Sequence, residues 1–389
     1  MNPIVSIVPC ETYEKETVRR ALEEVLAPLG GLSWVTPGMK IAVKVNLVTM
    51  LKPETAATTH PVAVTELCSM LTEKGAEVVV GDSPGGVFHA VYLKNVYRVT
   101  GMENVVAVGA KLNDDFTEKS AQYSEGRSLK QFDYTAWLDH ADVIINFCKL
   151  KTHGMMGMSA AVKNIFGVIP GVTKPEYHYR FPNTMDFAHM LVDLNEYFHP
   201  VLHLVDAITG MEGNGPTQGT PRHIGALLAS ENPYHLDLIC AKMIGLDRST
   251  VPTIQAAIDR KLSVEAAEEV PVNGDVLPFL QKDFKNIEQL KNIEFFTGGK
   301  TGIFSKIMDL VATKALCSRP KVRPNDCVGC KKCFEICPAK AITMKNKLPV
   351  IDRNKCIRCF CCQEFCPKGA MIVHRPALAK LLSPKKEKT

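Results

Sequence analysis

The cysteines near the C-terminal end constrain this chain more than any other feature. Eight of its 14 cysteines lie in two copies of a C-x2-C-x2-C-x3-C-P motif, "CVGCKKCFEICP" from Cys327 and "CIRCFCCQEFCP" from Cys356. Thiolates spaced three residues apart can face one common centre, because a tight loop aims them in the same direction. Zinc sites usually pair two short C-x2-C hooks, so the repeated three-plus-one pattern favours iron–sulfur clusters over zinc.

The repeat resembles a two-cluster bacterial ferredoxin, in which the fourth cysteine of each motif binds the other cluster. Cys361 lies inside the second motif but off its spacing, and we interpret it as a cysteine that is not a ligand. The resemblance implies two [4Fe–4S] clusters, one bound by Cys327, Cys330, Cys333 and Cys366, the other by Cys356, Cys359, Cys362 and Cys337.

The chain divides, by this interpretation, into an α/β domain (1–318), a two-cluster ferredoxin domain (319–376) and a basic tail (377–389). We interpret "RPKVRP" (319–324) as a linker, because its two prolines and three cations cannot continue a helix. Residues 319–389 hold 17 Lys and Arg against 5 Asp and Glu, whereas the rest of the chain is net acidic. The basic module could dock on the acidic domain, steer an acidic electron donor, or simply use its lysines for solubility.

The first 300 residues alternate between apolar strand patterns and amphipathic helical patterns. "IVSIVP", "KIAVKVNLV", "AEVVVGDSPGG", "ADVIINFCKLK" and "PVLHLVDAITG" read as strands, separated by helical stretches such as "PVAVTELCSMLTEKG". This alternation predicts an α/β fold with a mostly parallel sheet, followed by a small ferredoxin-like α+β domain.

Polar residues follow the predicted strands where each strand ends. Asn46 ends "VKVN", Asp82 and Ser83 end "VVVGDS", and Asp206 ends "HLVD". The glycine-rich loop 210–222 adds two polar residues, Glu212 and Asn214. Because ligands of open α/β sheets bind beyond the carboxyl ends of the strands, these residues predict a binding site at that edge.

"KLKTHGMMGMSAAVKNIFG" (149–167) places Lys149, Lys151, His153 and Lys163 in an apolar stretch without an acid. Buried lysines need an anion, which is either Asp82 or Asp206 from neighbouring strands or a ligand with a carboxylate or phosphate. "SAAVKN" predicts a helix with Ser159 as its N-cap, and an anion would gain from the N–H groups there. The alternative is that the lysines extend to solvent and that His153 is structural.

The stretches "KVNLV", "GDSPGG", "KLKTHG", "AAVKNIFGVIPG" and "VDAITGMEGNGPTQGTPR" resemble domain-of-unknown-function family 362. The resemblance covers about residues 3–300, and that family often carries a C-terminal ferredoxin pair. It therefore implies the architecture more than a particular reaction.

These observations predict an iron–sulfur oxidoreductase that passes electrons from two clusters to an anionic substrate or cofactor in the α/β domain. The alternatives are a non-catalytic electron-transfer subunit that docks a partner enzyme and a carrier of clusters. The predicted catalytic residues are His153, Lys151 and Asp82. The predicted substrate-binding residues are Asn46, Ser83, Lys149, Lys163, Asn164, Asp206, Glu212 and Asn214.

The predicted partners are an electron donor or acceptor protein of the ferredoxin or flavodoxin type and a small anionic ligand. No G-x-G-x-x-G follows a strand, so a flavin or other organic cofactor would have to bind in another way. No basic stripe interleaved with aromatic residues suggests nucleic-acid binding. No long apolar window predicts a membrane span, and no secretory signal pattern opens the chain, which favours a cytoplasmic protein.

Overall fold

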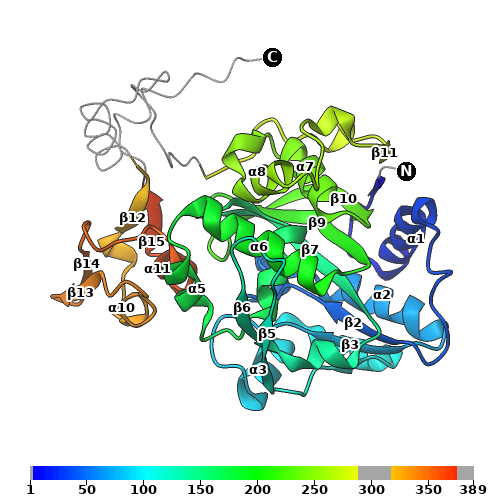
Figure 1. The fold of residues 1–389 in the computed structure, drawn as a ribbon, viewed down its shortest axis with the longest axis horizontal. Helices are drawn as coiled ribbons and strands as arrows, with labels where there is room; N and C mark the ends of the chain where they lie inside the picture. The colour runs from blue at the N-terminus through cyan, green and yellow to red at the C-terminus, as the bar shows by residue number, and fades with distance from the viewer. Residues whose placement is uncertain (1–2, 288–316, 375–389) are drawn as a thin grey trace. The chain divides into compact units, whose positions relative to one another are not determined.

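The apolar runs of the first part of the chain form the strands of one mixed sheet (Figure 1). The computed structural model describes residues 3–287 and 317–374. The strands of this sheet are β1 (Val5–Pro9), β2 (Lys40–Lys44), β3 (Glu77–Gly81), β4 (Lys111–Leu112), β7 (Val143–His153), β8 (Gly157–Ser159), β9 (Leu202–Glu212), β10 (Thr220–Ser230) and β11 (Val272–Asn273). A separate hairpin consists of β5 (Glu118–Gln122) and β6 (Gln131–Thr135).

The strand order is β11-β1-β10-β9-β7-β2-β3-β4, with β8 paired to β7. The neighbours from β9 to β4 pair in parallel, whereas β10 runs antiparallel to both β9 and β1. This confirms the predicted mostly parallel α/β sheet. The carboxyl ends of β2, β3, β7 and β9 therefore lie along the same edge.

Helices form two groups around this sheet (Figure 1). α1 packs against α2, while α4, α6, α7 and α8 pack against one another. Because helices cover it, β7 is almost entirely buried, including the polar residues of its second half. The helices are α1 (Lys15–Leu26), α2 (Pro61–Glu73), α3 (Ala90–Thr100), α4 (Ala161–Asn164), α5 (Lys174–Arg180), α6 (Thr184–Phe198), α7 (Pro233–Met243) and α8 (Pro252–Asp259).

Local sequence signals set the helix ends. α2 begins with Pro61 after His60, whose Nδ1 accepts a hydrogen bond from the Val62 N–H, and Gly75 follows its end with φ +83°. Asn183 and Asn232 cap α6 and α7 in the same way, each accepting from two backbone N–H groups. The elements predicted at 61–75 and 76–86 are thereby confirmed as α2 and β3.

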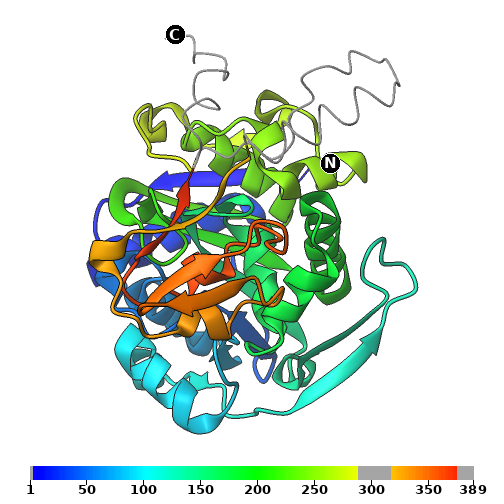
Figure 2. The ribbon, with the colours of Figure 1, turned by 90° about the vertical axis from the view of Figure 1, so that its left-hand side faces the viewer.

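The C-terminal part of the chain contains two short antiparallel sheets, drawn in orange and red in Figure 2. β12 (Arg319–Val322) pairs with β15 (Met371–His374), and β13 (Ile342–Lys345) pairs with β14 (Leu348–Ile351). The short helices α10 (Lys332–Glu335) and α11 (Cys361–Glu364) follow the first cysteines of each motif. The linker predicted at 319–324 is therefore wrong: Pro320 is buried, and β15 gives this segment a strand partner.

The chain separates into two units, Met1–Asn286 and Ile287–Thr389. The predicted division between residues 318 and 319 stays a prediction, and the predicted tail 377–389 lies outside the described residues. Of the helices in the described ranges, none has the length and apolar character that a membrane crossing requires.

Candidate functional site

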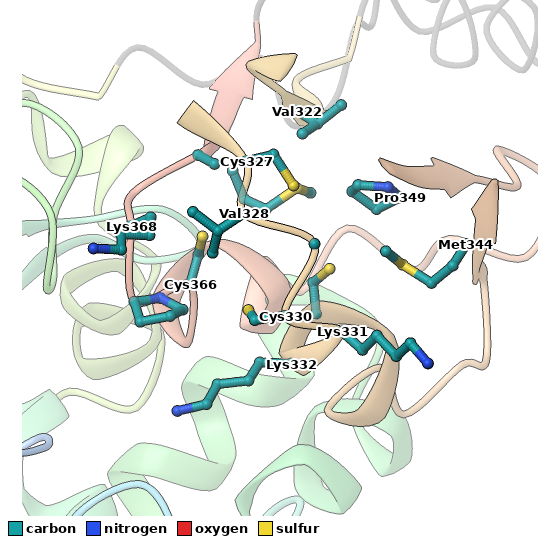
Figure 3. Close-up of a pocket in the computed structure, with 15 residues that line it drawn as sticks. Val322, Cys327, Val328, Cys330, Lys331, Lys332, Met344, Pro349, Cys366 and Lys368 are labelled. Carbon is teal, nitrogen blue, oxygen red and sulfur yellow. The ribbon is translucent and has the colours of Figure 1, made fainter. Parts of the chain in front are cut away.

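Four cysteines line one cavity of the C-terminal unit (Figure 3). They are Cys327, Cys330, Cys333 and Cys366, the set that the ferredoxin resemblance assigns to one cluster. Val322, Met344, Pro349 and Met371 complete an apolar wall, while Lys331, Lys332 and Lys368 point their ammonium groups away from the sulfur atoms. Cys333 and Cys366 also belong to the buried core of this unit.

The other four motif cysteines line a second cavity, together with Cys361. They are Cys337, Cys356, Cys359 and Cys362. The Ala341 N–H donates a hydrogen bond to Cys337 Sγ at 3.3 Å, the kind of contact that stabilises a thiolate. Cys361 is 1 % exposed, whereas Cys337, Cys356 and Cys359 are half-buried, so Cys361 differs from the motif cysteines in its spacing and is more buried than these three.

The two cysteine loops share an unusual backbone conformation. Gly329 and Arg358 occupy the middle of the first C-x2-C in each motif, and both have positive φ, at 67° and 59°. Two residues later Lys331 and Phe360 repeat it, at 64° and 62°. Left-handed residues curl the chain tightly, which brings three successive cysteines around one centre; for the non-glycine residues this conformation is strained.

The donor sets fit iron–sulfur clusters. Each cavity has the four motif thiols of one predicted cluster, from two separate loops on an apolar wall, and the second also has Cys361; this is the environment in which bound [4Fe–4S] clusters exchange single electrons. In the described ranges, no group of three or more His, Cys, Asp or Glu side chains is arranged to hold a single metal ion. The assignment of individual cysteines as ligands stays a prediction.

A buried ion pair marks the carboxyl edge of the α/β sheet. Lys44 Nζ, at the end of β2, lies 2.7 Å from Asp82 Oδ1, directly after β3, and both side chains are at most 3 % exposed. Asp82 Oδ2 accepts from the Leu47 N–H at 2.8 Å, and Lys44 donates to Asn164 Oδ1 at 3.1 Å. Burial lowers the pKa of Lys44, and the Asp82 carboxylate opposes that shift.

Asn164 connects β2 and β7 at this edge, and its partner Lys44 extends the network to Asp82 after β3. Its Oδ1 accepts from Asn46 Nδ2 at 2.9 Å, and its Nδ2 donates to Asn146 Oδ1 at 2.8 Å. Asn46 Oδ1 accepts in turn from Lys151 Nζ at 2.6 Å, and Lys151 also donates to the Ala57 carbonyl. The structure therefore joins four predicted site residues, Asn46, Asp82, Lys151 and Asn164, in one network.

A second buried pair lies beside the first, between β7 and β9. Lys149 Nζ is 2.8 Å from Asp206 Oδ2, and both side chains are at most 1 % exposed. The Tyr13 hydroxyl accepts from Lys149 and donates to Asp206 Oδ1, both at 2.8 Å, and the His60 ring stacks on Tyr13 with 3.5 Å between centroids. Asp206 is thus the internal anion that the sequence offered as one partner for the lysines. Burial lowers the pKa of His60 to about 4, which keeps this ring neutral near pH 7.

The prediction that Ser159 caps a helix and prepares an anion site is wrong. Ser159 ends β8, opposite Lys151, and α4 begins at Ala161. The first N–H groups of α4 donate instead to Asp237 of α7, from Ala161 to Oδ1 at 2.7 Å and from Val162 to Oδ2 at 3.2 Å. Burial raises the pKa of Asp237 to about 7. The carboxylate of Asp237, which is remote in sequence, therefore occupies the helix N-terminus where a ligand anion was expected.

The remaining predicted site residues lie around this network. His153 Nδ1 accepts from the Met155 and Met156 N–H groups at 3.1 and 3.2 Å, so the proton of the neutral ring is on Nε2. Glu212 is directed elsewhere, because its carboxylate accepts from the Lys285 N–H at 3.1 Å. Lys163 places its Nζ 4.5 Å from the Phe166 ring centroid.

The predicted Ser83 and Asn214 end up in different surroundings. Ser83 is buried, and within the described ranges its hydroxyl has no hydrogen-bond partner. Lys174 donates to the Ser83 carbonyl and faces Phe166 with Nζ 6.0 Å from the ring centroid, so two ammonium groups approach this ring. Asn214 lies half-buried in the loop that follows β9.

Sequence reasoning missed several residues at or beside the sheet edge: Tyr13, Lys44, His60, Asn146, Lys174 and Asp237. For Lys44 a signal existed, because a lysine inside the apolar run "IAVKVN" is as exceptional as those of "KLKTH". Tyr13 and Asp237 gave none, since a tyrosine near a helix start and an aspartate in an apolar helix acquire partners only through tertiary contacts.

Comparison with known proteins agrees with this architecture. Residues 41–242 match the family described as "Domain of unknown function (DUF362)", and residues 319–367 match a 4Fe-4S dicluster domain. The thylakoid-associated protein sll1697 of Synechocystis is 32% identical over 267 residues, 68% of this chain and 81% of that protein.

Two solved structures give weaker matches, each with a TM-score of 0.36. The lactate racemase apoprotein of Thermoanaerobacterium thermosaccharolyticum is 13% identical, covering 60% of this chain and 55% of that one. A protein of Thermotoga maritima is 12% identical, covering 55% of each chain. The chain thus spans about half the length of the solved structures that it matches.

A mixed α/β domain joined to a module with two four-cysteine cavities defines an iron–sulfur electron-transfer protein with two [4Fe–4S] clusters. Within this class, the chain belongs to the DUF362 family.

Proposed function

We propose that this protein is an oxidoreductase that passes electrons from its two clusters to an anionic substrate bound at the carboxyl edge of the α/β sheet. The observation that carries the proposal is the network centred on Asn164, which gathers polar side chains from β2, β3 and β7 at the edge where such sheets bind ligands. A fused cluster module raises the effective concentration of the electron donor for this site.

The half-buried members of the edge define the proposed ligand position. Asn46, Lys163, Gly167 and Lys174 are neither fully buried nor fully exposed, unlike Lys44 and Lys149. Lys163 and Lys174 both approach Phe166, so a carboxylate or phosphate near this ring would meet two cations. Asn46 is held by Lys151 and Asn164, which fixes its side chain for binding.

Proton supply in this proposal falls to His153 or Lys151. The backbone hydrogen bonds to His153 Nδ1 fix the tautomer in which Nε2 carries the proton. Lys151 is 1 % exposed and donates within the network. Asp82 has a positioning role, because it neutralises Lys44 instead of facing a ligand.

The alternative is an electron-transfer subunit whose α/β unit is a docking platform. One observation favours it: Lys44 and Lys149, two of the three lysines of the edge that are 1 % exposed, are already neutralised by Asp82 and Asp206. Under this alternative the network stabilises the fold and binds no substrate.

Reoxidation of the reduced clusters by small molecules distinguishes the oxidoreductase from the electron-transfer subunit. The dithionite-reduced protein is desalted anaerobically and mixed with a panel of carboxylates and organophosphates that carry a reducible C=O or C=C bond, which takes up two electrons and two protons, and cluster absorbance is followed. We expect one chemical class to reoxidise the clusters, and Lys163→Gln and Lys151→Met to slow this at least tenfold, while reoxidation by ferricyanide is unchanged.

The control is Lys40→Gln, which changes an exposed cation at the opposite end of β2. The oxidoreductase proposal fails if no panel member reoxidises the clusters, or if Lys40→Gln slows the reaction as much as Lys163→Gln. Location is a further proposal: we place the protein in the cytoplasm, and fractionation of cells tests whether it shares the thylakoid association in the Synechocystis relative's name.

A further inference from the structure

A basic cavity lies next to the second set of cysteines. It measures about 830 Å³, and Cys356 forms part of its wall. Its floor comes from Pro320 and Val322 of β12 and from Pro349 and Ile351 of β14. Five groups that are or can become cationic line it: Arg319, Lys321, Arg353, Arg358 and His374.

Among the residues that the structure describes, none that lines this cavity carries a carboxylate. Within the described ranges, the structure pairs none of Arg319, Lys321, Arg353 and Arg358 with an acidic side chain; the ion pair of this unit, Arg323 with Asp326, lies elsewhere. Partial burial and the neighbouring Arg353 guanidinium both lower the pKa of Arg319, which shows that like charges gather here. The described lining of this cavity therefore concentrates positive charge without a carboxylate to offset it.

The surroundings of the first set of cysteines differ. Lys331, Lys332 and Lys368 line that smaller cavity, but Lys331 points away on one side and Lys332 and Lys368 on the other (Figure 3). Cys330 is exposed there, so this side offers an alternative route to an electron carrier. Charge favours the other side, because its cations converge on one hollow beside Cys356.

We propose that this cavity is the docking site for an acidic electron-carrier protein, whose carboxylates meet Lys321, Arg353 and Arg358. These three side chains are exposed around the cavity. Exposed charges of this kind steer a partner of opposite charge into a transient complex. A carrier seated here contacts the wall that contains Cys356. The inference rests on electron transfer by the cluster domain and is independent of the proposed substrate site, so the two can fail separately.

Binding of an acidic flavodoxin as probe tests the proposal. Affinity is measured by calorimetry with the anaerobic, cluster-loaded full chain at 20 and 200 mM NaCl, alongside the rate of cluster reduction by flavodoxin hydroquinone. We expect binding at low salt that weakens at least tenfold at high salt, because surface charges are screened beyond about 8 Å. The triple variant Lys321→Gln/Arg353→Gln/Arg358→Gln should bind about tenfold more weakly, given the modest worth of each exposed pair.

The matched control removes the same charge from the first cavity: Lys331→Gln/Lys332→Gln/Lys368→Gln should change affinity less than about twofold. Iron content and the visible spectrum confirm that each variant contains its clusters. If the triple variant loses iron, the single variant Arg353→Gln, on an exposed loop, replaces it and should weaken binding about twofold. The proposal is overturned if the control weakens binding as much, if salt has no effect, or if inorganic phosphate displaces flavodoxin better than chloride of equal ionic strength. The last result would assign the cavity to a small anion.

Discussion

The cysteines of the C-terminal unit and the lysines of the α/β sheet edge are both chemically active groups gathered from distant positions, but they are arranged in opposite ways. Four thiols line the first cavity and five line the second, so the side chains face a space. Lys44 and Lys149 instead face Asp82 and Asp206 at 2.7 and 2.8 Å, so the charges face each other.

This difference separates a site built for an added group from one that is largely complete without one. Thiols around a cavity gain little from each other and gain much when a metal cluster binds. Buried ion pairs offset the cost of burying each charge, and removing one member leaves the other uncompensated. Chemistry at the sheet edge is therefore expected from the half-buried Asn46, Lys163 and Lys174, not from the buried pairs.

The largest effect should come from removing one thiol of the second cavity. Cys362→Ala deletes one of the four motif thiols that line this cavity, so we expect about half of the iron to be lost, along with about half of the visible absorbance. Cys361→Ala is the control at the adjacent position and should keep its iron. Equal iron loss in both variants would show that Cys361 is a ligand, and the grouping by motif would be wrong.

Removing the lysine of each ion pair should reduce the free energy of unfolding, and the loss should be larger where the remaining carboxylate keeps fewer hydrogen bonds. Lys44→Met leaves Asp82 with the Leu47 N–H as its remaining hydrogen bond, so we expect a loss of about 3–5 kcal/mol in the free energy of unfolding. Lys149→Met should cost less, because Asp206 keeps Tyr13 and the backbone N–H groups of His60 and Ile208.

Denaturant titration followed by tryptophan fluorescence measures this ranking, since both tryptophans of the chain, Trp34 and Trp137, lie in the α/β unit. Replacing both members of the first pair, in Lys44→Met/Asp82→Leu, should recover part of the loss, because no buried charge is left alone. A greater loss for Lys149→Met than for Lys44→Met would show that backbone hydrogen bonds do not compensate Asp206.

Much of the fold followed from the sequence because it depends on short-range patterns. The apolar runs gave the parallel strands, and Pro61 and Gly75 marked the two ends of α2. The segment 319–324 was misjudged because its prolines argue against a helix but not against an edge strand, and its partner β15 lies about 50 residues away. Strand pairing over that distance leaves no local signal.

The candidate site was predictable only to the level of the sheet edge. Strand ends placed Asn46, Asp82, Lys151 and Asp206 on one side, as parallel topology requires. The partner of each charge was not predictable, because Asp237 reaches α4 and Tyr13 reaches Asp206 through packing of elements remote in sequence. Charge in an apolar stretch shows that a partner must exist, but not which one.

The smallest expected effect is a pH dependence of the free energy of unfolding that arises in the α/β unit and not in the cluster module. Burial and then the charge of Lys163 lower the pKa of His178 to about 3, and its ring stacks on Phe187 with 4.4 Å between centroids. The unfolded chain binds a proton there below about pH 6.5, whereas the folded chain does not until about pH 3. The free energy of unfolding therefore falls as pH falls through this window, by up to about 1.4 kcal/mol per pH unit.

His178→Phe keeps the stack and removes the titration, so the variant should lose less stability than the wild type between pH 6.5 and 4. The same fluorescence titration, repeated across this range, gives the difference in slope. Parallel slopes for the two proteins would mean that His178 titrates normally in the folded chain and is not buried as described.

The central claim is that the C-terminal cavities hold two [4Fe–4S] clusters, and metal analysis of the anaerobically purified protein tests it most directly. The account predicts about eight iron atoms and eight acid-labile sulfides per chain, with an electron paramagnetic resonance signal from interacting reduced clusters after dithionite treatment. Stoichiometric zinc without iron or sulfide would contradict it.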